Sequence, residues 1–387
     1  MKPIYLDNNA TTACDPEVLE AMLPFFQQQF GNPHSPHVMG RKAMHHVEKA
    51  RESVAAGLGC EPDEILFTAG ATESNNIALF GLAKGILNDR KRILVCATEH
   101  KSVLYPCEEL AANGFVVEKI PVNSQGEIRL DVLQQQLSTD TLVVSVHAAN
   151  NEVGTIQPLA AVSQLVHERG ALLHTDAAQA CGKMPLKFSD LGVDLASISA
   201  HKLYGPKGIG ALFVRRGLSP GVMRTVIQGG GQERGLRPGT LNVAGIVGMG
   251  VAFALAEVRL HQDVRHIADL RDAFEHKIEV VLECYFNGHG AQRLSGTTSI
   301  TFPGVPADML IANVPELCIG MGSACSSGTL SPSHVLLAMG LCREDAGCTI
   351  RVSFGRTNSQ RDVQIAADLI GRAVSSLRTE ASNRVQI

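Results

Sequence analysis

The sequence contains no tryptophan, and aromatic residues make up only 4% of its 387 positions. Proteins that bind single-stranded nucleic acid by stacking usually carry more aromatic side chains, so this class is disfavoured. An excess of basic charge is also missing, because 34 lysines and arginines stand against 38 aspartates and glutamates. Without a basic field, direct binding to nucleic acid through its phosphates is not expected.

The ten cysteines include no pair spaced as CxxC, so zinc ribbons and thioredoxin-like dithiols have no support. A chain of this length can bury a large core and does not need disulfides. The N-terminus becomes polar before a signal-peptide hydrophobic segment could form. The longest apolar stretch, residues 241–256, is shorter than the ~20 residues of a spanning helix and predicts a buried helix. We expect a cytoplasmic protein with reduced thiols, no membrane association and no bound metal.

Short β-branched segments alternate with helix-length segments over the first 215 residues. The seven strand candidates are Glu64–Thr68, Arg92–Ala97, Val116–Val122, Leu142–His147, Ala171–Thr175, Leu195–Ser199 and Gly210–Arg215. Helices are expected over 74–88, 101–113 and 159–169. This alternation predicts a mostly parallel α/β sheet with helices on both faces. After a glycine-rich stretch at 229–240, we expect the buried helix, a charged helix over about 257–283, and a smaller α/β unit.

Polar residues follow five of these strand candidates at the point where each ends. In open parallel sheets, ligands bind beyond the carboxyl ends of the strands, where loops and helix N-termini converge. The residues at these ends are Ala69–Ser74, Thr98–His100, Asn150–Glu152, Asp176–Gln179 and His201–Lys202. One edge of the sheet should therefore bring together a histidine, a lysine, a carboxylate, two amides and a turn of small residues.

Lys202 lies between an apolar strand candidate and a Gly-Pro turn. Most lysines are solvated, but a strand end opposite Asp176 favours a partly buried amine that can form a Schiff base. The turn at Ala71 and Thr72 begins a helix whose free N–H groups favour an anion. An ordinary helix N-cap without a bound anion would have the same sequence pattern. His100 offers a flat group against the ring, or else is a capped loop histidine. Together these residues suit pyridoxal phosphate, which needs a lysine, an anion site and a carboxylate for its ring nitrogen.

A second feature is the segment at 319–329, where small and polar residues surround Cys325. Burial as an inert thiol is the usual state of a cysteine, and it is expected for Cys60, Cys96, Cys107, Cys181, Cys284 and Cys348. No apolar periodicity surrounds Cys325, which indicates an exposed, nucleophilic thiol. Arg351 lies in an alternating strand candidate and is either a clamp for a substrate carboxylate or part of a structural salt bridge.

These motifs resemble those of the NifS/IscS-type cysteine desulfurases, which are fold-type I, aspartate aminotransferase-like pyridoxal phosphate enzymes. The similarity runs in order through YLDNNATT (5–12), FGNPHS (30–35), TAGATESNN (68–76), TEHKSV (98–103), NNEVGT (150–155), HTDAAQ (174–179), SAHKLYGPKGIG (199–210), GGGQERGLRPGT (229–240), GSACSSGTLSPSHVL (322–336) and RVSFGR (351–356). The cysteine segment is similar to the longer-loop branch of the family. The resemblance implies a large cofactor domain over 14–255 and a small domain over 1–13 and 256–387.

The resemblance also implies how the cofactor is held. Lys202 would carry it, Asp176 would pair with its ring nitrogen, and His100 would stack on the ring. Asn151 and Gln179 would hold its 3′-oxygen. The residues implied at its phosphate are Ala71, Thr72, Ser199, His201 and, from a second copy of the chain, Thr240.

The implied reaction is the desulfuration of L-cysteine by a homodimer. Asn151 and Arg351 would orient the substrate carboxylate, and Cys325 would take the sulfur as a persulfide while L-alanine is released. The sulfur would pass to an acceptor protein for iron–sulfur cluster assembly or for thiolation of tRNA, DNA or a cofactor. An aminotransferase or β-lyase on the same fold is the nearest alternative. A cofactor-free sulfur relay or metal-binding protein is a third possibility.

Overall fold

The computed structural model describes residues 3–85, 89–218, 221–321 and 332–385. At its centre lies a seven-stranded sheet. Its strands, in spatial order, are β2 (Ile65–Thr68), β8 (Gly210–Val214), β7 (Leu195–Ser199), β6 (Leu172–Asp176), β5 (Thr141–Ser145), β3 (Arg92–Cys96) and β4 (Val116–Ile120). Strand β8 is antiparallel to both neighbours, and the remaining pairs are parallel. The predicted mostly parallel, seven-stranded sheet is confirmed.

Helices cover both faces of this sheet because successive strand residues alternate between two cores. Leu66 and Val143 belong to a core built with α4 (Ala71–Lys84) and α5 (Lys101–Ala112). Their neighbours Phe67 and Val144 belong to the opposite core. The helices of that second face include α3 (Val38–Leu58), α6 (Leu130–Gln136), α7 (Leu159–Glu168), α8 (Phe188–Leu191) and the start of α9 (Val243–Val281).

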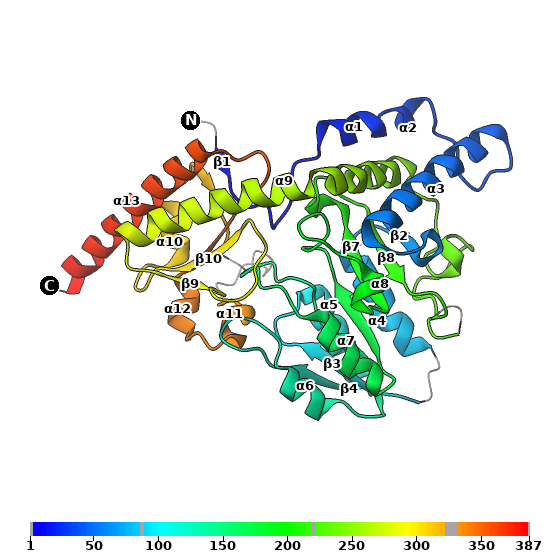
Figure 1. The fold of residues 1–387 in the computed structure, drawn as a ribbon, viewed down its shortest axis with the longest axis horizontal. Coiled ribbons are helices and arrows are strands. Elements are labelled where there is room, and N and C mark those ends of the chain that lie inside the picture. Colours follow the sequence, from blue (N-terminus) through cyan, green and yellow to red (C-terminus); the bar gives the residue numbers. More distant parts are fainter. Residues whose placement is uncertain (1–2, 86–88, 219–220, 322–331, 386–387) are drawn as a thin grey trace.

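A second unit forms its own core around the end of α9 (Figure 1). Its sheets have the order β12-β10-β9 and β1-β11. The elements are β1 (Ile4–Tyr5), β9 (Tyr285–Asn287), β10 (Thr297–Thr301), α10 (Ala307–Ala312), β11 (Leu317–Cys318), β12 (Thr349–Ser353) and α13 (Gln360–Val385). Two short helices, α11 (His334–Ala338) and α12 (Arg343–Gly347), precede β12, but their buried residues Val335, Leu336 and Ala346 belong to the core of the large sheet. The N-terminal residues Ile4 and Leu6 pack into this core. The division into domains at 13/14 and 255/256 stays a prediction.

The prediction of two helices over 241–256 and 257–283 is wrong, because α9 is one continuous helix (Figure 1). No proline or glycine interrupts the chain between Val251 and Leu282, so the change from apolar to charged residues marks a change of surroundings. The first part packs against α3, and a Cβ on Gly250 would lie 2.7 Å from the Cα of Ala50. The later part packs against α13. The helix is long and apolar enough to cross a membrane, yet half of its most apolar window is buried in the protein.

The remaining boundaries differ from the predictions by a few residues. Helix α4 begins at Ala71 rather than at residue 74. Gly70, which precedes the helix, has a φ of 155°, a backbone conformation that residues with a side chain rarely adopt. This conformation allows the helix to begin directly after β2. Two short helices, α1 (Pro16–Met22) and α2 (Pro24–Gln27), precede α3.

Candidate active site

A cavity of about 910 Å³ opens at the carboxyl ends of the parallel strands. Ten of the predicted site residues line it: Ala71, Thr72, His100, Asn151, Asp176, Gln179, Ser199, His201, Lys202 and Arg351. Thr240 is exposed and is not part of the lining. Cys325 lies outside the described residues. Residues that follow the five strands therefore line one cavity, as the strand positions predicted.

Lys202 reaches the cavity because the chain turns sharply after β7. Ser199 ends that buried strand, and a 3-10 turn over Ala200–Lys202 directs the lysine toward the N-terminal segment. Its Nζ donates to the carbonyl oxygens of Asn9 and Ala10 at 2.6 and 2.7 Å. The amine is thus half-buried and held at a defined position.

Asp176 ends β6 and is 7% exposed. Its Oδ1 accepts a hydrogen bond from the backbone N–H of Ala178 at 3.0 Å, and its Oδ2 accepts one from Nδ2 of Asn75 at 2.8 Å. Asn75 lies on α4 and is fully buried. The sequence pattern did not single out Asn75, because a buried amide on a helix has no distinctive local signal.

His100 caps the N-terminus of α5. Its Nδ1 accepts the backbone N–H of Ser102 at 3.1 Å and lies 2.8 Å from the Oγ of Ser102. His100 therefore caps a helix and also lines the cavity. A helix cap and a flat group in the cavity are compatible roles for His100, because only one ring nitrogen is used for the cap.

The N-terminus of α4, where an anion is expected, lines the cavity through Ala71 and Thr72. A Cβ on Gly210 would lie 2.6 Å from the Cα of Gly70, so position 210 needs glycine for the strand and the turn to pass so closely. Burial, with the charges of Lys202 and Lys207, lowers the pKa of His201 to about 4. His201 is then neutral near pH 7. Its Nδ1 lies 3.0 Å from the Oγ1 of Thr11, another residue of the lining.

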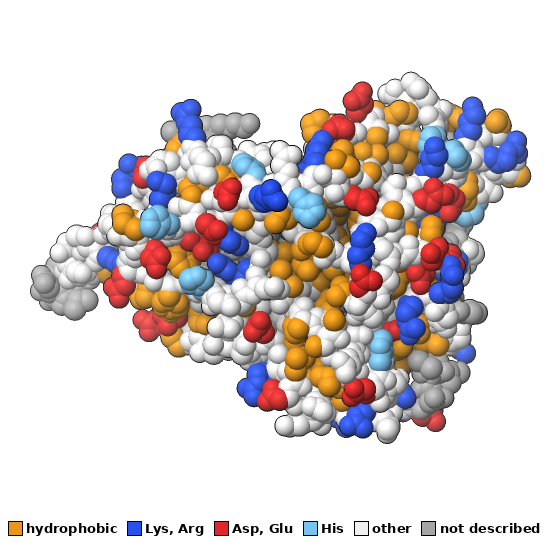
Figure 2. Space-filling view, in the orientation of Figure 1, with side chains coloured by type: hydrophobic (Ala, Val, Ile, Leu, Met, Phe, Trp, Pro, Cys, Tyr) orange, Lys and Arg blue, Asp and Glu red, His pale blue; other side chains and the backbone are white. Residues whose placement is uncertain are grey.

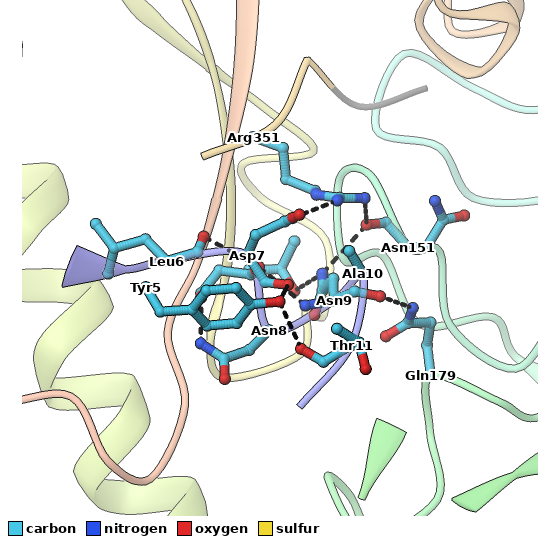
Figure 3. Close-up of polar contacts among 12 residues, drawn as sticks. Tyr5, Leu6, Asp7, Asn8, Asn9, Ala10, Thr11, Asn151, Gln179 and Arg351 are labelled. Atoms are coloured by element: carbon cyan, nitrogen blue, oxygen red, sulfur yellow. Dashed lines mark hydrogen bonds and ion pairs between the residues drawn. The ribbon is translucent and has the colours of Figure 1, made fainter. Parts of the chain in front are cut away.

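The segment around Asn9 contributes contacts that the sequence reasoning did not assign (Figure 3). The Nε2 of Gln179 donates to the carbonyl oxygen of Asn9 at 2.8 Å. Lys183 donates from Nζ to the Oε1 of Gln179 at 2.7 Å and to the Oδ1 of Asn9 at 3.2 Å. Because the carbonyl oxygen of Asn9 only accepts, the Nε2 of Gln179 must face Asn9, and the Oε1 of Gln179 then faces Lys183. Burial, followed by the charge of Lys202, lowers the pKa of Lys183 to about 7.

Arg351, on β12, is 3% exposed and lines the cavity. Its Nη2 donates to the Oδ1 of Asp7 at 2.6 Å, and its Nη1 donates to the carbonyl oxygen of Asn151 at 3.0 Å (Figure 3). The salt-bridge interpretation is thus correct for the pair with Asp7. The position of the guanidinium in the cavity wall also agrees with the carboxylate-clamp interpretation.

A further carboxyl group, Glu152, lines the cavity and was not assigned a role from the sequence. Ser333, which caps the start of α11, donates a hydrogen bond from its Oγ to the Oε2 of Glu152. His334 is bonded through Nε2 to the carbonyl oxygen of Glu99 at 2.9 Å. Burial raises the pKa of Glu152. These contacts hold the start of α11 against the cavity.

The residues present fit pyridoxal phosphate. The cavity contains a half-buried lysine amine, a buried carboxylate, an exposed imidazole and a helix N-terminus, whose free N–H groups favour an anion. Among the residues that the structure describes, no group of three or more histidines, cysteines or acidic residues could hold a metal ion. The donor set therefore matches an aldehyde, a protonated ring nitrogen and a phosphate.

Comparisons with known proteins agree with this chemistry. A family model described as Aminotransferase class-V matches residues 4–365. The cysteine desulfurase IscS of Rickettsia felis is 44% identical over 379 residues, which are 97% of this chain and 92% of that protein. A solved NifS-like protein has a TM-score of 0.90 at 39% identity, covering 96% of this chain and 99% of that chain. The structure titled "SspA in complex with cysteine" has a TM-score of 0.82 at 36% identity, covering 92% and 99%.

Proposed function

The chain belongs to the aminotransferase class-V family and is a pyridoxal phosphate-dependent cysteine desulfurase, and we propose that Lys202 holds its cofactor while Cys325 accepts the sulfur. One observation carries the proposed cofactor site. The amine of Lys202, the carboxylate of Asp176 and the imidazole of His100 line one cavity, although they come from different elements. When bound, the cofactor supplies an electron sink next to the α-carbon of the substrate.

The surrounding residues divide the task of holding this group. The buried carboxylate of Asp176 would keep the ring nitrogen protonated, and His100 would cover the ring. Gln179, whose amide is oriented by Asn9, and Asn151 would donate to the 3′-oxygen. The proposed phosphate ligands are Ala71, Thr72, Ser199 and His201, together with Thr240 from a second copy of the chain.

L-cysteine is the proposed substrate, and its carboxylate would bind Arg351 beside Asn151. In the transfer, the thiolate of Cys325 attacks the sulfur of the substrate. A new S–S bond forms, the C–S bond breaks, and its electron pair stays with the carbon. Protonation of that carbon completes L-alanine and leaves the persulfide on the enzyme.

Several other thiols are poor competitors for this role. Burial raises the pKa of Cys60, Cys96 and Cys107 to about 12 and that of Cys284 to about 11. Only a thiolate is nucleophilic, so these four residues stay inactive near neutral pH. Their protonation supports the choice of Cys325, whose sequence surroundings are small and polar.

The same proposal includes a homodimer. Thr240 does not line the cavity of its own chain. Hydrophobic side chains that are more than half exposed gather on and next to α1 and α2, as Figure 2 shows for this edge of the molecule: Leu19, Leu23, Phe26, Phe30 and Val38. A patch of this kind indicates an interface, and we propose that a second copy covers it. A cytoplasmic location and a sulfur-acceptor protein for iron–sulfur assembly or thiolation complete the proposal.

Product analysis tests the reaction directly. Purified enzyme with L-cysteine should form alanine and reducible persulfide sulfur in equal amounts. A β-lyase would instead give pyruvate and ammonia, and an aminotransferase would need a keto acid as a second substrate. Borohydride reduction followed by peptide mapping should place the pyridoxyl group on Lys202. A label on Lys207, which also lines the cavity, would contradict the assignment.

A further inference from the structure

One buried amide connects two of the proposed cofactor residues. The Nδ2 of Asn75 lies 2.8 Å from the Oδ2 of Asp176 and 2.8 Å from the Oγ of Ser102. A carboxylate only accepts hydrogen bonds, so the nitrogen of the Asn75 side chain must face Asp176. The same nitrogen then donates its second N–H to Ser102. The orientation of this amide is therefore determined by its partners.

The orientation continues through Ser102 to His100. Because the Oγ of Ser102 accepts from Asn75, its own hydrogen is available to donate, and the Nδ1 of His100 lies 2.8 Å away. The backbone N–H of Ser102 also donates to this Nδ1 at 3.1 Å. Two donors point at one ring nitrogen, so Nδ1 holds a lone pair. The proton of the neutral imidazole is consequently on Nε2.

This arrangement opposes a positive charge on His100. An imidazolium ion would carry a hydrogen on Nδ1, which would break both hydrogen bonds from Ser102. A ring nitrogen of the cofactor that is paired with Asp176 would itself be protonated and positively charged. A second cation stacked on that ring would be repelled, whereas a neutral imidazole is not. The amide of Asn75 thus favours a charged Asp176 at the nitrogen of the cofactor ring and, through Ser102, a neutral His100 on the face of that ring.

We infer that Asn75 is a positioning residue that orients the carboxylate of Asp176 and, through Ser102, fixes His100 as the Nε2–H tautomer. Asn75 is fully buried and is not part of the cavity lining, so it would act through its two neighbours. The inference rests on the proposed function for its purpose, since it assumes that the ring lies between Asp176 and His100. The tautomer of His100, which is the structural part of the inference, can be measured without cofactor and without turnover.

The first test uses cofactor-free wild-type enzyme labelled with [15N]histidine. The His100 signals are identified by their absence in His100→Gln. Near pH 8 we expect a protonated Nε2 and an unprotonated Nδ1. A protonated Nδ1 would overturn the inference. A failure of the enzyme to make alanine would instead overturn the proposed function and leave this measurement valid, so the two failures can be distinguished.

The second test compares variants of two buried asparagines. Asn75→Ala should weaken cofactor binding about tenfold or more, because a hydrogen bond to a carboxylate is lost. It should also shift the pH profile of the cofactor absorbance. Asn287→Ala is the matched control, since Asn287 is also a buried asparagine but lies outside the cavity lining, where its Nδ2 donates to the hydroxyl groups of Ser299 and Thr301 at 3.2 and 3.0 Å. The cofactor affinity of this variant should stay within about twofold of wild type. Equal effects of both variants would contradict the inference.

Ser102→Ala keeps the inference testable if Asn75→Ala does not fold. This variant retains the contact between Asn75 and Asp176 but removes one of the two donors to Nδ1 of His100. We expect a detectable fraction of the Nδ1–H tautomer, with cofactor affinity changed less than in Asn75→Ala. An unchanged tautomer in Ser102→Ala would show that the hydroxyl does not hold the ring, and the connection to Asn75 would be wrong.

Discussion

Asp7 forms an ion pair with Arg351, a residue of the cavity wall, although 344 positions separate the two in the sequence; 2.6 Å lies between Oδ1 and Nη2 (Figure 3). The guanidinium is 3% exposed, so its charge is almost removed from water. Asp7 belongs to the N-terminal segment, and the neighbouring Asn9 and Ala10 accept hydrogen bonds from Lys202. A short segment at the start of the chain therefore positions both the lysine and the arginine of the proposed site.

Replacing Asp7 should destabilise the fold more than replacing an exposed partner. Asp7→Asn leaves a buried cation without this negative charge, and we expect the free energy of unfolding to fall by about 3 kcal/mol. Glu118→Gln, in the more exposed pair with Arg92, is the control and should cost less than about 1 kcal/mol. Urea denaturation measures both. Equal losses would show that the Asp7–Arg351 pair contributes no more than a surface pair.

Arg351 should affect substrate binding more than turnover. Arg351→Lys retains the positive charge but cannot form a bidentate contact, so we expect KM for L-cysteine to rise about tenfold or more with a smaller change in kcat. Arg293→Lys is a suitable control, because Arg293 forms a similar buried pair with Glu275 outside the cavity lining. Steady-state kinetics would contradict the substrate-clamp assignment if both variants kept the wild-type KM.

Lys183 should make stability depend on pH. Its pKa is lowered to about 7 in the folded protein from an ordinary value of 10.5. Between these values the unfolded chain binds more protons than the folded one, so stability rises with pH. We expect wild type to gain free energy of unfolding relative to Lys183→Met as pH increases from 7 to 10. Lys187→Met, which removes an exposed lysine nearby, controls for the loss of charge. A constant difference between wild type and Lys183→Met would contradict the lowered pKa.

The proposed dimer can be tested by complementation. Chains carrying Thr240→Ala and chains carrying Lys202→Ala are each expected to be impaired. If Thr240 acts in the site of the other subunit, a mixed dimer has one site with both defects and one site with neither. Unfolding and refolding the two chains together should then restore alanine formation. No recovery in verified mixed dimers would mean that Thr240 acts within its own chain or is not needed.

The sequence predicted the site better than it predicted the contacts that build it. The carboxyl ends of parallel strands lie at one edge, so Asp176, Asn151 and Lys202 could be brought together from strand positions alone. The roles of Asn75 and Lys183 could not be predicted in this way. They depend on which buried groups lie opposite in the fold, and neither residue stands at a strand end.

The same limit explains the error in α9. Apolar residues up to 256 and charged residues after it suggested two helices. The break in composition reflects two environments along one helix, first α3 and then the core of the C-terminal unit. The polarity of the side chains along a helix reflects what the helix packs against. Only a proline, a glycine or a capping residue indicates where the helix ends.

The most direct test of the proposed sulfur transfer is mass spectrometry of the enzyme after one turnover with L-cysteine. We expect the persulfide on Cys325 in wild type. Cys325→Ala should retain the cofactor absorbance and bind L-cysteine, because Lys202 is unchanged, but it should form almost no persulfide or alanine. A persulfide on Cys318 or Cys342, or near-normal alanine formation by Cys325→Ala, would contradict the assignment of Cys325 as the sulfur acceptor.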